Sequence, residues 1–173
     1  AIDIASAEGV ALVRQLAELG LAFGRDQNAS TSFMDTTYRL DISEVTPHKL
    51  DVAFRWMSDI TNGLTISQAE VDQERGVILS EYADTRDPMR EVGERILRFL
   101  GPNLRVAQRA PIGTRENITN VPATTLRGYY QRWYRREIAS IVVVGDGDPA
   151  DFRRRIETSF AGWRHPAPAR APL

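Results

Sequence analysis

Residues 70–81 read Glu70-Val71-Asp72-Gln73-Glu74-Arg75-Gly76-Val77-Ile78-Leu79-Ser80-Glu81, and the rest of the chain is organised around them. The stretch is predicted to be a helix, because Ser67 and Glu70 have the spacing of a capping box. At about 100° per residue, apolar side chains and carboxylates share one arc of this helix. The arc holds Val71, Ile78, Tyr82, Glu70, Glu74 and Glu81. Carboxylates on a buried face are costly unless a cation meets them.

Glu74 and Glu81 are seven residues apart, so they lie two turns apart on one stripe. A rise of about 1.5 Å per residue separates their backbones by roughly 10 Å, which is too far for one ion to take both as equal ligands. One metal ligand and one supporting carboxylate is therefore the natural division. The alternative is that both glutamates pair with arginines across a helix interface, and the spacing leaves both interpretations open.

The composition is that of an ordinary soluble globular protein, with 173 residues, 42% hydrophobic and 26% charged. A net charge of −1 gives no argument for binding nucleic acid or an anionic membrane. The chain has no cysteine, which excludes disulfides and thiolate metal sites. The longest apolar run, residues 138–144, is too short to span a bilayer. The compartment stays open between the bacterial periplasm, slightly favoured, and the cytoplasm.

Amphipathic patterns and end signals predict further helices at residues 7–19, 47–62, 88–100, 122–133 and 149–160. Two of these starts, Thr46-Pro47 and Asp148-Pro149, have a cap followed by proline. The apolar faces predicted for 47–62 and 122–133 are Leu50, Phe54, Met57 and Ile60, and Leu126, Tyr129, Tyr130 and Trp133, respectively. Strands are predicted at residues 29–33 and 36–42, and at 138–144, whose continuous β-branched run suggests burial on both faces. Residues 102–118 are predicted to be mostly loop. This irregular order indicates an α+β fold, with helices packed on a mostly antiparallel sheet.

Three strands are few for a sheet that must cover so many helices. The sequence is therefore expected to lack strands of its domain. Residues 1–164 are interpreted as a partial peptidase domain, and residues 165–173, rich in proline and alanine, as a linker.

Four segments together resemble the pitrilysin/insulinase family of zinc metallopeptidases, the inverzincins, which include the mitochondrial processing peptidase. They are Asn28-Ala29-Ser30-Thr31-Ser32-Phe33 with Thr37-Tyr38; Glu74 to Glu81; Pro111-Ile112-Gly113-Thr114; and Tyr130-Gln131-Arg132-Trp133-Tyr134 leading into Val142-Val143-Val144-Gly145-Asp146. Each is weak alone, but their order and separations make the combination fairly specific. The whole resembles the later part of the family's N-terminal, metal-carrying domain.

The family binds zinc through two histidines of His-x-x-Glu-His and a glutamate on a later helix. The resemblance implies that Glu81 is this later ligand and that Glu74 is a supporting carboxylate. His-x-x-Glu-His is absent here, and the only histidines, His48 and His165, are interpreted as solvated. The motif would precede Ala1. Because Glu81 alone would bind zinc poorly, this chain by itself is expected to be inactive and not to hold zinc tightly.

The resemblance also implies a substrate strand at Asn28, Ala29, Ser30 and Thr31, where a peptide adds itself by backbone pairing. The alternative is an ordinary strand start. Expected partners are a peptide substrate and a second homologous domain or subunit, with no nucleic acid and no membrane span. The function implied is that of a part of a zinc metalloendopeptidase. The rivals are a non-catalytic subunit of the same fold, and a structural domain whose glutamates only form ion pairs.

Overall fold

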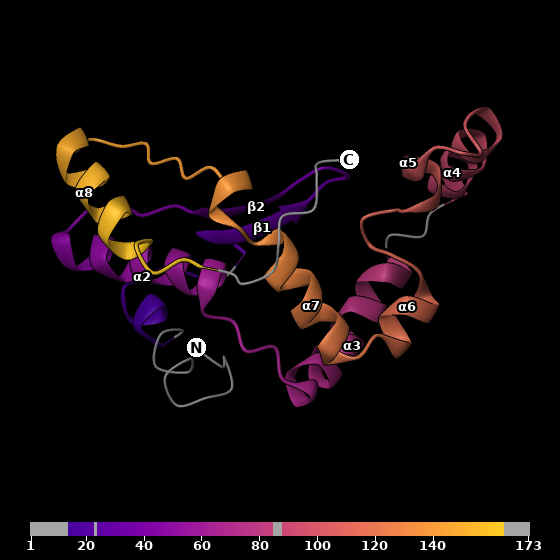
Figure 1. The fold of residues 1–173 in the computed structure, drawn as a ribbon, viewed down its shortest axis with the longest axis horizontal. Helices are drawn as coiled ribbons and strands as arrows, with labels where there is room; N and C mark the ends of the chain where they lie inside the picture. Colours follow the sequence, from indigo (N-terminus) through magenta and orange to yellow (C-terminus); the bar gives the residue numbers. More distant parts are fainter. Residues whose placement is uncertain (1–13, 23, 85–87, 165–173) are drawn as a thin grey trace. The chain divides into compact units, whose positions relative to one another are not determined.

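The computed structural model describes residues 14–22, 24–84 and 88–164. The chain divides into two compact units, the first containing residues 1–28, 38–66 and 124–173, and the second containing residues 29–37 and 67–123. The elements, labelled in Figure 1 except for η1, are β1 (Gln27–Thr31), β2 (Thr36–Leu40), α2 (Pro47–Asn62), α3 (Gln68–Asp84), α4 (Pro88–Leu100), α5 (Arg105–Gln108), α6 (Arg115–Asn120), α7 (Ala123–Trp133), η1 (Arg136–Ile138) and α8 (Pro149–Ser159).

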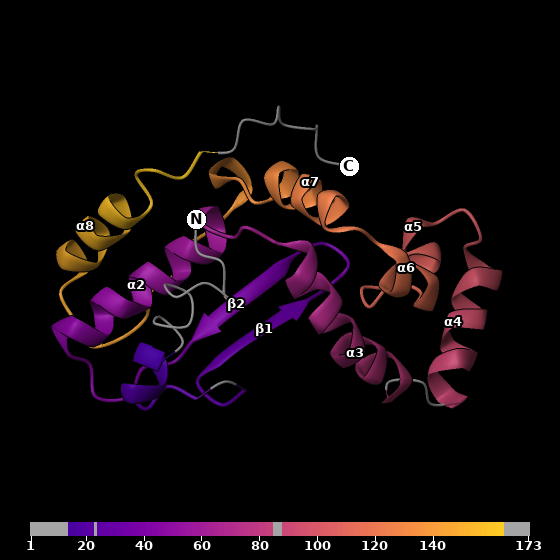
Figure 2. The ribbon, with the colours of Figure 1, turned by 90° about the horizontal axis from the view of Figure 1, so that it is seen from below.

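The strands β1 and β2 form a small antiparallel two-stranded sheet (Figure 2). On β2, Tyr38 and Leu40 are half-buried while Thr37 and Arg39 are exposed, as the alternating pattern predicted. With helices packed against this sheet, the α+β prediction is confirmed.

The first unit contains an apolar core. Leu16, Leu21 and Val52 are buried against one another, with Leu40 and Trp56 packed on them. Residues 14–18 are helical and end at a glycine, Gly20, whose φ of +77° is the left-handed conformation that closes helices. The part of the predicted helix at residues 7–13 lies outside the described residues. Val52 was not among the residues predicted to face inward from 47–62.

Two helices far apart in the sequence, α2 and α8, lie side by side in this unit (Figures 1 and 2). Thr46 caps α2 by accepting from the backbone N–H of Lys49 at 3.2 Å, and Asp148 caps α8 by accepting from Ala150 at 2.9 Å. Ser58 on α2 donates to the backbone oxygen of Ser159 at 2.8 Å. The predicted cap-and-proline helix starts are thus confirmed.

A cluster of tyrosines joins β2 to the end of α7 in the same unit. Tyr38 and Tyr134 share a short hydroxyl–hydroxyl hydrogen bond, and the rings of Tyr130 and Tyr134 lie 4.7 Å apart. Tyr130 also donates to the backbone oxygen of Ile60 at 2.8 Å. Tyr129, which the helical pattern placed on the same apolar face, is 58% exposed.

The second unit has little apolar core. Ile118 and Ala123 are the buried hydrophobic residues among those that the structure describes in it. The helix α4 begins at Pro88 and ends before Gly101, as predicted, but most of its apolar side chains are exposed. The exposed ones are Met89, Val92, Ile96, Phe99 and Leu100.

The prediction of a strand at residues 138–144 was wrong. Residues 139–144 form no strand, and Val142 and Val144 are 79% and 92% exposed. A strand satisfies its backbone groups only through a neighbouring strand, and the described sheet contains β1 and β2 alone. Residues 102–118 are mostly loop, as predicted, although the short helix α5 and the first part of α6 also form there.

The predicted linker, residues 165–173, lies outside the described residues. Within the described ranges, none of the helices combines the length and apolarity needed to cross a membrane.

Candidate functional site

The helix α3 carries both candidate carboxylates, Glu74 and Glu81. Its start is the predicted capping box, with Ser67 accepting from the Glu70 N–H at 3.3 Å and Glu70 accepting from the Ser67 N–H at 2.7 Å. One continuous helix then runs from Gln68 to Asp84, so the two carboxylates share one stripe at a two-turn separation. The local prediction for this stretch is therefore confirmed.

The expected apolar face of α3 is not buried. No residue of this helix is buried, Ile78 is 38% exposed and Val77 is 63% exposed. Glu74 and Glu81 are both exposed, and within the described residues neither forms an ion pair or hydrogen bond. The burial cost that the sequence pattern suggested is therefore not incurred here. The arginine partners of the alternative interpretation are not seen on these two side chains.

Arg75, to which the sequence pattern assigned no role, makes the strongest polar contacts of α3. Its guanidinium donates to the backbone oxygens of Ile118 and Val121, each at 2.5 Å, and to Asp72 at 3.0 Å. Its side chain is 18% exposed. No local signal in the sequence points to these partners, because they are backbone oxygens of a distant segment.

The four candidate substrate residues lie on β1 or at its end. Asn28, Ala29, Ser30 and Thr31 are all exposed, and the Thr31 hydroxyl lies 3.3 Å from that of Thr36 on β2. Peptide addition requires a strand whose edge the substrate can reach. The strand itself agrees with the prediction, although it begins at Gln27 and ends at Thr31.

The described residues do not by themselves fit a zinc ion. No cluster of three or more His, Cys, Asp or Glu side chains that could hold a metal occurs among them. His48 is exposed at the start of α2, and His165 lies outside the described residues. Glu81 supplies one oxygen donor, whereas catalytic zinc usually takes about three protein ligands.

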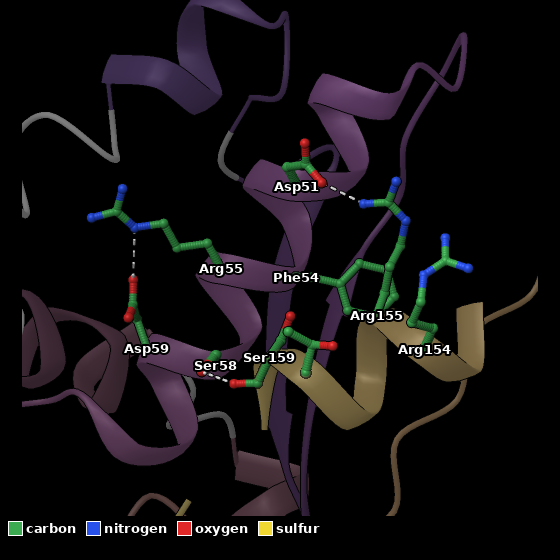
Figure 3. A pocket seen from close by; sticks show the side chains of 9 residues that line it. Asp51, Phe54, Arg55, Ser58, Asp59, Arg154, Arg155 and Ser159 are labelled. Carbon is green, nitrogen blue, oxygen red and sulfur yellow. Dashed lines mark hydrogen bonds and ion pairs between the residues drawn. The ribbon is translucent and has the colours of Figure 1, made fainter. Parts of the chain in front are cut away.

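A pocket of about 490 Å³ lies between α2 and α8 in the first unit (Figure 3). Its charged side chains neutralise one another. Arg155 bonds to Asp51 and to Asp151, the latter at 2.7 Å, and Arg55 lies 3.8 Å from Asp59. None of the predicted site residues lines it. The arrangement is that of a groove between packed helices, closed by ion pairs.

The tyrosine cluster is the most perturbed titratable group. Burial raises the pKa of Tyr130 to about 12. Burial, followed by the hydrogen bond with Tyr38, raises the pKa of Tyr134, and burial likewise raises that of Tyr38. These hydroxyls stay protonated near neutral pH, so the cluster serves as hydrogen-bonded packing rather than as a general base.

Comparisons with known proteins give one consistent answer. The family model described as "Insulinase (Peptidase family M16)" matches residues 5–99, and the model "Peptidase M16 inactive domain" matches residues 120–173. The chain is 34% identical over 140 residues to a protein named "Probable zinc protease PqqL" from Escherichia coli, covering 81% of this chain and 15% of that protein. A relative with the same name from Haemophilus influenzae is 33% identical over 137 residues, covering 79% and 15%.

Solved structures agree. The first half of the periplasmic protease PqqL from Escherichia coli superposes with a TM-score of 0.85 at 30% identity, covering 94% of this chain and 35% of that one. A variant of the ferredoxin protease FusC, solved with Arabidopsis ferredoxin, gives 0.84 at 28% identity, covering 92% and 18%. The chain thus spans about 15% of the length of the two curated relatives.

Proposed function

Because the chain belongs to the insulinase family of peptidases, we propose that it is part of a zinc-dependent endopeptidase that hydrolyses peptides or unfolded segments. The observation that carries the proposal is the continuous helix α3, which presents Glu74 and Glu81 on one exposed stripe. Relatives named as zinc proteases support the metal.

Glu81 is proposed as the carboxylate ligand of the zinc, and Glu74 as the carboxylate that supports the site electrostatically. The remaining ligands, two histidines, would come from a part of the parent protein outside residues 1–173. Bound zinc would supply a Lewis acid and a water of lowered pKa. The residues of this chain would contribute one anionic donor and the negative field beside it.

The substrate is proposed to pair with β1 along Asn28, Ala29, Ser30 and Thr31, which are exposed. Main-chain pairing holds an extended peptide with little demand on its side chains. A second homologous domain or subunit is proposed to complete the peptidase. The greater length of the relatives supports this, since the chain covers 18% of the chain solved for the periplasmic protease PqqL from Escherichia coli. Residues 1–164 would then be a partial peptidase domain and residues 165–173 its linker.

A second candidate is a non-catalytic subunit of the same fold. The feature that discriminates the two candidates lies outside residues 1–173, where the parent protein either does or does not encode His-x-x-Glu-His. The presence of both Glu74 and Glu81 favours the active parent, because an inactive protein has no chemical need for them.

The test is zinc content and peptide turnover of the parent protein with Glu81→Gln or Glu74→Gln. Glu81→Gln should remove the zinc and the activity, because an amide keeps the shape but loses the anionic oxygen. Glu74→Gln should cost about 10–100-fold in affinity or activity, as supporting residues do. Glu18→Gln, which alters an exposed carboxylate of the first unit, is the matched control and should change neither.

The reverse order, with zinc lost in Glu74→Gln and kept in Glu81→Gln, would exchange the two roles. If neither variant changes zinc content or turnover, the metal assignment is wrong. The 173-residue chain alone should retain no stoichiometric zinc after dialysis and cleave no fluorogenic peptide.

A further inference from the structure

Besides its ion pair with Asp72 on its own helix, Arg75 bonds to the end of a second helix. Its Nη1 and Nη2 atoms donate to the backbone oxygens of Ile118 and Val121. These two residues lie at the C-terminal end of α6, where Val121 is the cap. Carbonyl groups at a helix end have no partner within the helix and form its negative end. The planar guanidinium, always charged, carries parallel donors that match two such oxygens.

The helix α6 needs this contact more than a long helix would. It has six residues, and isolated helices shorter than about 12–15 residues are marginal in water. Its first turn is capped by Thr114, which accepts from the Asn117 N–H at 3.2 Å, and Arg75 satisfies the other end. Gly113, with φ of +80°, makes the turn that leads into the cap. The turn at Gly113 and the cap at Thr114 thus determine where α6 begins.

Polar contacts contribute to fixing the rotation of α3 against its neighbours. The helix has no buried residue, and its apolar side chains Val71, Leu79 and Tyr82 are only half-buried. A second polar contact acts at its N-terminal end, where Gln68 accepts from the backbone N–H of Ala123 at 3.0 Å. Gln68, Asp72 and Arg75 follow an i, i+4, i+7 stripe. Glu74 is one residue, about 100°, away from this stripe, and Glu81 lies near Glu74 around the axis.

We infer that Arg75 is a positioning residue, which clamps α3 to the C-terminal end of α6 and thereby sets the direction of the Glu74 and Glu81 stripe. The clamp itself depends only on the contacts within the second unit. Its consequence for zinc rests on the proposed function, in which Glu81 is a ligand.

The experiment compares Arg75→Ala and Arg75→Lys in the parent protein, with Arg98→Ala as matched control. Arg98 is also a helical arginine of this unit, but it is 57% exposed and pairs with Glu94 on its own helix at 3.0 Å. The first readout is amide hydrogen exchange at residues 115–121 and along α3, measured after zinc has been removed. Arg75→Ala should speed exchange in both places, and Arg98→Ala should leave them unchanged.

The second readout is the affinity for zinc and the visible spectrum after cobalt(II) substitution. Arg75→Ala should weaken zinc binding about 10–100-fold and alter the cobalt spectrum. Arg75→Lys should give a zinc affinity between those of the wild type and Arg75→Ala. An ammonium group can donate to one carbonyl oxygen but lacks the two parallel donors of a guanidinium. If Arg75→Ala does not fold, the lysine variant decides.

Each failure has its own signature. Unchanged exchange at residues 115–121 would overturn the clamp. Faster exchange with unchanged zinc affinity and cobalt spectrum, while Glu81→Gln still loses zinc, would reduce Arg75 to a structural residue. If Glu81→Gln itself keeps zinc, the proposed function is wrong. The hydrogen-exchange result for Arg75→Ala would still decide whether Arg75 clamps α3 to α6.

Discussion

The interactions that stabilise the first unit internally differ from those within the second unit. The first unit buries an apolar cluster of Leu16, Leu21 and Val52. In the second unit the described contacts of α3 are polar, from Arg75 to backbone oxygens and from an N–H to Gln68. Exposed apolar side chains on α4 complete the contrast. A helix satisfies its own backbone, so α3 forms without a buried face, and side-chain hydrogen bonds then determine its orientation.

The largest expected effect tests the core of the first unit. Leu16→Ala should lower the free energy of unfolding by about 2–5 kcal/mol, because it leaves a cavity at a side chain with no exposed surface. Ile78→Ala on α3 is the matched comparison and should cost less than about 1 kcal/mol, because its side chain is partly solvated. Urea unfolding of both variants provides the measurement. Equal losses would mean that the second unit has a core of its own and would end the comparison.

A smaller effect should appear at alkaline pH, in the first unit alone. An unfolded tyrosine has an ordinary pKa of about 10, whereas that of Tyr130 is about 12 in the folded unit. Below the lower value both states keep the proton. Between the two values the unfolded state releases the proton that the folded state retains, so the free energy of unfolding falls as pH rises.

Urea unfolding at about pH 8 and about pH 11, followed by the fluorescence of the three tryptophans, which all lie in the first unit, measures this loss. Tyr130→Phe should lessen the pH dependence, while Tyr129→Phe, at an exposed ring, should retain it. Loss of the α3 helix over the same range, with the first unit intact, would contradict the assignment to the tyrosine cluster.

The smallest effect on stability is expected at the exposed run after η1. Val142→Lys with Val144→Lys should change the free energy of unfolding by no more than about 0.5 kcal/mol each. The pair should nevertheless reduce self-association, because charged residues block the pairing of exposed β-branched segments. Light scattering against concentration detects the change, and Val45→Lys, at a valine 51% exposed elsewhere in the unit, is the control. Unaltered scattering in the double variant would mean that self-association does not involve Val142 and Val144.

The sequence predicted the helices better than the strands, for a physical reason. Helix ends depend on neighbours a few residues away, so Thr46, Ser67 and Asp148 could be recognised as caps from their spacing alone. A strand at residues 138–144 depends on a partner that no local pattern names, and none is described beside it. The β-branched residues of this segment are apolar, but their composition did not predict its secondary structure correctly.

The candidate site was predictable in part. The stripe of Glu74 and Glu81 followed from helical periodicity, and α3 confirms their shared helix. The prediction that this stripe is buried was wrong, because periodicity shows which side chains share a face of the helix and not which elements cover that face. The role of Arg75 was out of reach, since its partners are backbone oxygens more than 40 residues away, and backbone oxygens carry no sequence signature.

That choice of partner bears on how this part of the family can vary. Arg75 contacts the carbonyl groups of Ile118 and Val121, which every residue possesses, so many side chains at these two positions would preserve the contact. The length of the chain between Gly113 and Val121 is another matter, because one inserted or deleted residue would shift the helix end away from the guanidinium. We therefore expect evolution to tolerate substitutions in α6 far better than insertions or deletions, with Arg75 the fixed point against which its length is measured.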